Sequence, residues 1–171
     1  MTGLSDKLKV SAVQFLLWQK KCMLFTLEQS DGLTGRPDVF GLTKNRETIE
    51  IEIKVSVSDF LRNKNKLTMK LRDSLAHKGP NYFYYMMPNG IAQKVQFRVE
   101  DKHGLICWDN DQPNGWRVLK RATKIHPQKT SVQRIASLVR EQSSTCLGLM
   151  EKLRRSEFIR KADAERARID V

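Results

Sequence analysis

Hydrophobic and polar positions alternate along the first half of the chain in a way that predicts one helix followed by three strands. A helix is expected over 8–21, because apolar residues recur there at helical spacing: Val10, Val13, Leu16 and Leu17. Short apolar and aromatic runs predict strands over 23–28 and 38–43, with the turn-forming segment 30–37 between them. A third strand is expected over 48–56.

The segment 48–56 has the clearest strand pattern of the chain. Its two faces would carry Ile49, Ile51, Ile53 and Val55 on one side, and Glu50, Glu52, Lys54 and Ser56 on the other. Side chains two residues apart point the same way, so Glu52 and Lys54 are expected to share a face. We expect Glu50 on that face to be a solvent-exposed strand residue. The alternative role for Glu50 is an acid that supports a neighbouring site.

The rest of the chain continues the same α/β pattern. A basic helical segment is expected from Ser58 until Gly79 and Pro80 end it. The aromatic run over 81–87 then predicts a buried strand. Later strands and a final helix are expected over 104–108, over 116–124 and from Ser131 onward.

This order of elements predicts an α/β fold built on a mixed sheet. We expect one domain over 1–130 and a C-terminal helical extension over 131–171. Apolar residues in the extension follow a weak seven-residue repeat that Gln142 interrupts. The repeat favours packing onto the domain, with a coiled-coil homodimer as the alternative.

The charge balance points to a polyanionic partner. Lys and Arg number 31 against 19 acids, which gives a formal net charge of +12. Such an excess favours nucleic acid, because each neutralised phosphate releases condensed counterions. A basic protein with no nucleic-acid role is the alternative. Net charge indicates which partners a protein attracts, but it does not indicate the fold.

Cysteine usage and hydropathy indicate the compartment in which the protein is expected and whether a membrane partner is expected. The three cysteines, Cys22, Cys107 and Cys146, are far apart and form no CxxC pair, which argues against a disulfide framework and a zinc site. A reducing cytoplasm fits this pattern. No apolar run approaches the roughly 18 residues that span a bilayer, so no membrane partner is expected.

Three side chains in the predicted hairpin suggest metal chemistry. Asp38 begins one strand, while Glu52 and Lys54 share a face of the next. Two carboxylates on adjacent strands, a backbone carbonyl and waters form the hard oxygen shell that Mg²⁺ prefers. A lysine beside them can orient an attacking water or stabilise charge that builds on a phosphate. An amphipathic strand with a merely solvated face is the structural alternative.

The residues over 35–42, followed by Glu52-Ile-Lys54, resemble the signature of the PD-(D/E)XK nuclease superfamily. The run over 52–60 is similar to MmcB-like DNA repair proteins, and the resemblance covers about 8–87. It implies a restriction-endonuclease-like αβββαβ core, here with extra C-terminal strands and a helical tail. It also implies a Mg²⁺- or Mn²⁺-dependent nuclease that acts on DNA, in repair, recombination or phage DNA processing.

The resemblance assigns roles to particular residues. Asp38 and Glu52 would be metal ligands, the Ile53 carbonyl would complete the shell, and Lys54 would be the catalytic lysine. The family often has a further acid upstream, commonly on the first helix. This chain has Gln14 where that acid is sought, and Glu28 is the nearest substitute.

Several basic side chains are candidates for contacts with the nucleic-acid backbone. They lie in the segment after Ser58 and in the last predicted strand: Lys64, Lys66, Lys70, Arg72, Lys120 and Lys124. A solvated basic face is the alternative interpretation. No base-reading motif is visible, so the sequence predicts no preference for a particular DNA sequence.

Three functional hypotheses remain open at this point. The first is an active deoxyribonuclease, with an endonuclease favoured. The second is a catalytically silent nuclease fold that binds DNA or protein, which the missing upstream acid motivates. The third is a basic interaction protein that docks on another protein through its helical tail.

Overall fold

The computed structural model describes residues 3–28, 37–62, 79–144, 146–148 and 150–151. The chain divides into two units, Met1–Ser131 and Val132–Val171. The first unit holds the sheet and the candidate site.

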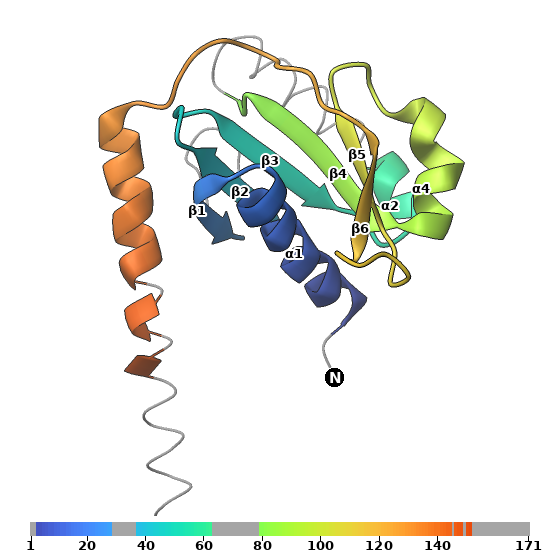
Figure 1. The fold of residues 1–171 in the computed structure, drawn as a ribbon, viewed down its shortest axis with the longest axis horizontal. Coiled ribbons are helices and arrows are strands. Elements are labelled where there is room, and N and C mark those ends of the chain that lie inside the picture. Colours follow the sequence, from blue (N-terminus) through green and yellow to red (C-terminus); the bar gives the residue numbers. More distant parts are fainter. Residues whose placement is uncertain (1–2, 29–36, 63–78, 145, 149, 152–171) are drawn as a thin grey trace, which may run out of the picture. The chain divides into compact units, whose positions relative to one another are not determined.

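A six-stranded mixed sheet forms the centre of the first unit (Figure 1). Its strands are adjacent in sequence order: β1 Cys22–Leu27, β2 Val39–Thr43, β3 Thr48–Ile53, β4 Tyr82–Pro88, β5 Gly104–Trp108 and β6 Trp116–Lys120. β1, β2 and β3 form an antiparallel meander, β3, β4 and β5 run parallel, and β6 returns antiparallel to β5. The mixed α/β architecture predicted from the sequence is therefore confirmed.

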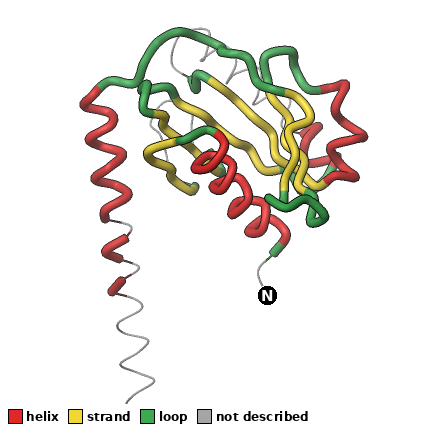
Figure 2. The backbone as a smooth tube through the Cα atoms, viewed as in Figure 1, coloured by secondary structure: helices red, strands yellow, loops and turns green. Residues whose placement is uncertain are grey.

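Helices cover both faces of this sheet (Figure 2). The helical segments of the first unit are α1 Leu4–Gln14, a π-helical turn Phe15–Gln19, α2 Val57–Arg62, α4 Asn89–Val95 and a 3₁₀ turn Gln96–Arg98. α1 crosses one face, while α2 and α4 lie on the other (Figure 1). In the second unit, residues 132–144 form a helix.

α1 and the π-helical turn pack on the first face through apolar residues at helical spacing. Leu8, Phe15 and Leu16 are fully buried there, among the isoleucines of β3. Phe15 meets Tyr84 edge-on, with ring centroids 5.4 Å apart. Gly41 makes the close approach possible, because a Cβ at this position would lie 2.9 Å from the methyl carbons of Leu16.

A second apolar cluster fills the opposite face of the sheet. Phe60 of α2 packs edge-on against Tyr85, with ring centroids 5.1 Å apart. Ala92 and Val95 of α4 pack against the same cluster, which includes Met87. Burial on both faces explains why β4 is an uninterrupted apolar run in the sequence, as buried parallel strands commonly are.

The prediction that Glu50 is exposed on the polar face of β3 is wrong. β3 lies between β2 and β4, and α2 and α4 cover the face that carries its acids. Glu50 is 0% exposed and Lys54 is 2% exposed. Alternation gave the correct side for the residues within β3, but it does not say that a second layer covers that side. Val55, predicted on the apolar face, lies beyond the strand and is exposed.

Several element boundaries also differ from the predictions. The first helix starts at Leu4 rather than at residue 8, and a π-helical turn follows it after Gln14. β3 ends at Ile53 and β6 ends at Lys120, so both strands are shorter than expected. Pro88-Asn-Gly90 has the composition of a turn, yet α4 begins at Asn89. Proline just before a helix suits its first turn, and the apolar contacts of α4 offset the roughly 1 kcal/mol cost of a helical glycine.

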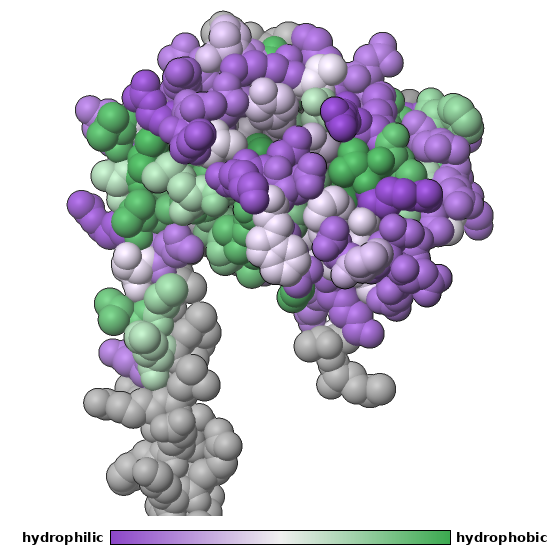
Figure 3. Space-filling model, viewed as in Figure 1, coloured by the Kyte–Doolittle hydropathy of each residue, from purple (hydrophilic) through white to green (hydrophobic). Residues whose placement is uncertain are grey.

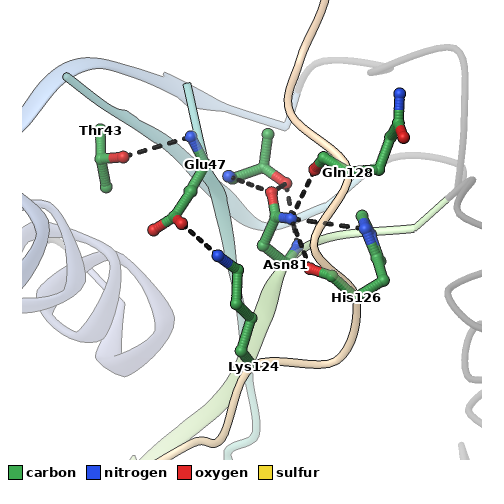
Figure 4. A network of polar contacts seen from close by, with 7 residues as sticks. Thr43, Glu47, Asn81, Lys124, His126 and Gln128 are labelled. Carbon is green, nitrogen blue, oxygen red and sulfur yellow. Dashed lines mark hydrogen bonds and ion pairs between the residues drawn. The ribbon is translucent and has the colours of Figure 1, made fainter. Parts of the chain in front are cut away.

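The segment 121–130 runs back across the sheet and is held there by Asn81 (Figure 4). The Asn81 side chain donates to the backbone carbonyls of His126 and Gln128, at 3.0 and 2.7 Å. Its oxygen accepts the backbone N–H of Thr48 at 2.7 Å. His126 in turn lies 2.8 Å from the carbonyl of Gly79. One buried amide thus joins the start of β3, the start of β4 and the returning segment.

No helix among the described residues is both long and apolar enough to cross a membrane. In the second unit, Val132, Val139, Leu147 and Met150 are exposed. A homodimer through this helix stays a prediction. The tail after 151 lies outside the described residues.

Replacing Asn81 with alanine should destabilise the first unit by about 2–3 kcal/mol, because its buried partners lose their hydrogen bonds. Urea denaturation at neutral pH measures the loss. Gln93→Ala is the matched control, since this amide only contacts Asn89 on an exposed helix surface, and it should change stability by less than about 0.5 kcal/mol. Equal effects of the two substitutions would contradict the role given to Asn81.

Candidate functional site

The register of β2 and β3 brings Asp38 and Glu52 together. Val39 pairs with Ile51 in the antiparallel ladder, so Asp38, one residue before β2, lies opposite Glu52. The Asp38 Oδ2 atom accepts the backbone N–H of Ile53 at 2.8 Å. This hydrogen bond holds the carboxylate at the carboxyl end of β3.

The two carboxylates influence each other electrostatically. Burial raises the pKa of Asp38 above its ordinary value, and the negative charge of Glu52 raises it further. The Ile53 N–H and the positive charges of Lys54 and Lys9 act in the opposite direction. A net upward shift of the pKa means that the nearby positive charges and the N–H do not fully offset the cost of ionising Asp38. A bound cation would therefore stabilise the ionised carboxylates.

Lys54 lies beside the same acids, although it is almost completely buried. Its backbone N–H donates to the carbonyl of Met86 on β4 at 3.0 Å, which extends the parallel ladder by one residue. Its Nζ is 3.0 Å from Oε1 of Glu52 and 4.0 Å from Oδ1 of Asp59. A buried ammonium is tolerated when carboxylates surround it in this way.

Asp59 comes from the first turn of α2, which Ser56 caps. The Ser56 hydroxyl oxygen accepts the backbone N–H of Asp59 at 3.0 Å, as expected for an N-cap residue. The geometry gives the capping contact to Ser56 and places Asp59 near Lys54.

Glu28 reaches the site from the end of β1. Its backbone N–H donates to the Asp38 carbonyl at 3.1 Å, and its φ of +50° is the left-handed conformation, which is uncommon outside glycine. Its carboxylate forms a hydrogen-bonded ion pair with Lys9 of α1. Glu28 is therefore adjacent to Asp38, with its charge engaged by a lysine.

Lys9 is the site residue that the sequence analysis missed. The hydrogen bond to Glu28 raises the pKa of Lys9, and its charge acts on Asp38 as well. The expected position of the upstream acid, Gln14, lines a cavity beside the β5–β6 loop. α1 therefore places the positive charge of Lys9 near the carboxylates, whereas the family pattern has an acid on the first helix. No spacing marks Lys9, because its role depends on how α1 lies across the strands.

The predicted nucleic-acid contacts fall into two groups. Lys120 Nζ donates to the backbone carbonyls of Val99 and Glu100, at 3.0 and 2.8 Å. Lys124 forms an ion pair with Glu47 (Figure 4). Both ammonium groups thus have intramolecular partners. The other four candidates lie outside the described residues: Lys64, Lys66, Lys70 and Arg72.

The donor set suits a hard cation that keeps part of its water shell. Among the described residues, no three or more His, Cys, Asp or Glu side chains gather as a ligand group. Asp38 and Glu52 supply two carboxylates, and Mg²⁺ is usually bound through one or two carboxylates, waters and substrate phosphates. The residues present therefore fit such an ion. A ligand role for the Ile53 carbonyl stays a prediction.

Asp38→Asn should stabilise the metal-free protein at neutral pH. The folded-state pKa of Asp38 is raised, so native stability falls as pH rises through that pKa, and asparagine cannot ionise. Thermal unfolding in EDTA should give the variant a higher Tm at neutral pH, and the gap should close toward acidic pH. The exposed Asp101→Asn is the control and should show no gap. A variant less stable than wild type at neutral pH would contradict the analysis.

Comparisons with known proteins bear on the fold alone. No protein-family model matches the sequence, and no curated protein matches it significantly. A solved structure of a protein of unknown function from Silicibacter pomeroyi is similar to this chain, with a TM-score of 0.60 and 17% sequence identity. The similarity covers 92% of this chain and 96% of that chain. At this identity it shows a shared mixed α/β fold, and function has to be argued from the site.

Proposed function

We propose that this chain is a metal-dependent deoxyribonuclease of the PD-(D/E)XK type, similar to MmcB-like DNA repair proteins. The observation that carries the proposal is the convergence of Asp38, Glu52 and Lys54 at the carboxyl end of β3. Two facing carboxylates and a buried lysine form a strained charge cluster, which is typical of a functional site rather than of a solvated strand.

The order of elements supports the same family. α1, then β1 to β3, then α2 and β4 follow one another as in the αβββαβ core that the motif implies. β5, β6 and the helix over 132–144 are the additions expected after that core. The described fold is therefore compatible with a restriction-endonuclease-like core.

Asp38 and Glu52 would hold the Mg²⁺ or Mn²⁺ ion. The bound ion would supply Lewis-acid polarisation of a phosphoryl oxygen and lower the pKa of a coordinated water. The Ile53 N–H keeps the Asp38 carboxylate in place, so its orientation does not depend on the ion. Relief of the repulsion that raises the pKa of Asp38 would contribute to metal affinity.

Lys54 would act on the scissile phosphate. Its Nζ lies 3.0 Å from Glu52, and its burial excludes most competing water. An ammonium held there can donate to a non-bridging phosphate oxygen or orient the attacking water as negative charge develops. Asp59, 4.0 Å away, would hold the lysine in position.

The charge of the chain favours DNA as the substrate. A formal net charge of +12 supplies the long-range attraction that a polyanion requires. In the space-filling view, hydrophilic residues cover much of the face that carries α1 (Figure 3). Basic side chains in the segment after α2 stay candidates for backbone contacts.

A nuclease fold that binds DNA without cleaving it is the second candidate. The observation in its favour is Lys9, which neutralises Glu28 beside Asp38. With that acid engaged, the site has less negative charge with which to hold a cation. Salt-sensitive DNA binding, with no cleavage in either Mg²⁺ or Mn²⁺, would select this function.

Glu52→Gln should reduce metal-dependent cleavage of plasmid DNA by at least about 100-fold, because several kcal/mol of transition-state stabilisation depend on the ion. Gel assays in Mg²⁺ and in Mn²⁺ measure the loss. Glu47→Gln makes the same change beyond the other end of β3, where the carboxylate pairs with Lys124, and should leave cleavage intact. Clean cleavage by the Glu52→Gln protein would remove Glu52 from the mechanism.

Lys54→Met should separate metal binding from chemistry. Methionine fills a similar volume, and the two carboxylates stay available to the ion. Calorimetry should therefore detect Mg²⁺ binding by the variant, while cleavage falls by about 100-fold or more. Cleavage at the wild-type rate would show that the lysine serves only as a structural counter-charge.

A further inference from the structure

A cavity of about 570 Å³ lies between α1 and the loop that joins β5 to β6. Its volume falls within the range of roughly 300–1,000 Å³ that is typical of small-ligand sites. The residues that line it and carry the argument are two indoles and four amides: Trp18, Trp108, Gln14, Asn110, Gln112 and Asn114. None of them belongs to the carboxylate site.

The two indoles come from different elements. Trp18 lies in the π-helical turn that follows α1, and Trp108 is the last residue of β5. Trp18 is 55% exposed, although tryptophan usually buries its large ring. Single π-helical turns inside α-helices are frequent at functional sites. An exposed ring at the mouth of a cavity is suited to stacking on a flat ligand.

The amides are presented by a loop that internal backbone hydrogen bonds close. Gly115 N–H donates to the Gln112 carbonyl at 2.8 Å, and Asp109 N–H donates to the Gly115 carbonyl at 3.1 Å. Gly115 has a φ of +71°, which suits glycine and closes the loop. Asn110, Gln112 and Asn114 alternate along this loop, and all three line the cavity.

The lining has little net charge, because Asp6 and Lys7 offset each other. Side-chain amides carry both donors and acceptors, so they match the edge of a nucleobase, while an indole matches its face. The face and the Watson–Crick edge of a base are open to such contacts only when the base is unpaired. We propose that this cavity binds an unpaired nucleobase of a single-stranded nucleic acid.

A sugar ring also suits indoles and amides, so the choice rests on charge. The +12 chain attracts a phosphate backbone, and a neutral oligosaccharide would gain nothing from that charge. Around the N-terminal end of α1 the surface is mainly hydrophilic to intermediate in hydropathy (Figure 3). A nucleobase that enters the cavity would leave its own backbone near this polar surface.

The proposal goes beyond the carboxylate site and holds whether or not the chain cleaves DNA. α1 separates the two places: Lys9 pairs with Glu28 beside Asp38, while its neighbour Val10 lines the cavity. Base binding can therefore be measured in EDTA, where metal-dependent cleavage does not interfere.

The test is a titration of the full chain with a short fluorescein-labelled single strand of mixed sequence, followed by anisotropy and by tryptophan fluorescence. Two of the three tryptophans line the cavity, so binding should quench their emission. Trp18→Ala should weaken binding by about tenfold, the loss expected when a base loses one stacking partner. Trp18→Phe should restore most of the affinity.

Phe97→Ala is the matched control, because Phe97 is 92% exposed and is not among the residues lining the cavity. It should bind like wild type. An abasic strand of equal length should bind more weakly than the normal strand and leave tryptophan emission unchanged. The proposal is overturned if Trp18→Ala binds like wild type or if the abasic strand binds equally well. Quenching by an oligosaccharide but not by the strand would also overturn it.

Discussion

The pairing of β3 with both neighbours is the constraint on which the rest of the structure depends. Antiparallel register with β2 places Asp38 opposite Glu52, and parallel pairing with β4 continues to Lys54 through the Met86 carbonyl. The same pairing puts β3 inside the sheet, where α2 and α4 cover its acidic face. Charged side chains at the end of an enclosed strand lose part of their hydration, so they compensate one another or bind a cation.

The partly buried carboxylates of this site reduce the stability of the fold, and under the proposed function they serve to bind a metal ion. Burial raises the pKa of Asp38, and the negative charge of Glu52 raises it further, which a purely structural strand would avoid. Lys54 offsets part of it from within the site, and Lys9 offsets another part from α1. The second contribution distinguishes this chain from the expected nuclease pattern, because it brings a positive charge to the place of a third acid. Under the proposed nuclease function, that balance of charge would determine whether the chain cleaves DNA or only binds it.

α1 contributes residues both to the carboxylate site and to the cavity beside the β5–β6 loop. It is held on the sheet by its own Leu8 and by Phe15 and Leu16 of the following π-helical turn, and Gly41 allows the close contact with Leu16. Lys9 lies on the side toward β1 and Asp38, while Val10 and Gln14 line the cavity beside the β5–β6 loop. A short helix can serve both places because adjacent residues point about 100° apart. A shift of α1 would therefore alter the charge at the carboxylates and the shape of the cavity together.

The sequence by itself determined the α/β class, most of the strands and the proximity of Asp38, Glu52 and Lys54, because alternation with a period of two assigns faces directly. It could not determine that Glu50 is buried, since burial depends on the layer above the strand. It missed α4, whose Pro-Asn-Gly start carries turn signals that Ala92 and Val95 override by packing. Only the tertiary structure decided that Lys9 rather than Gln14 approaches the carboxylates. It alone also placed Trp18 and Trp108 around one cavity, because both depend on how α1 crosses distant strands.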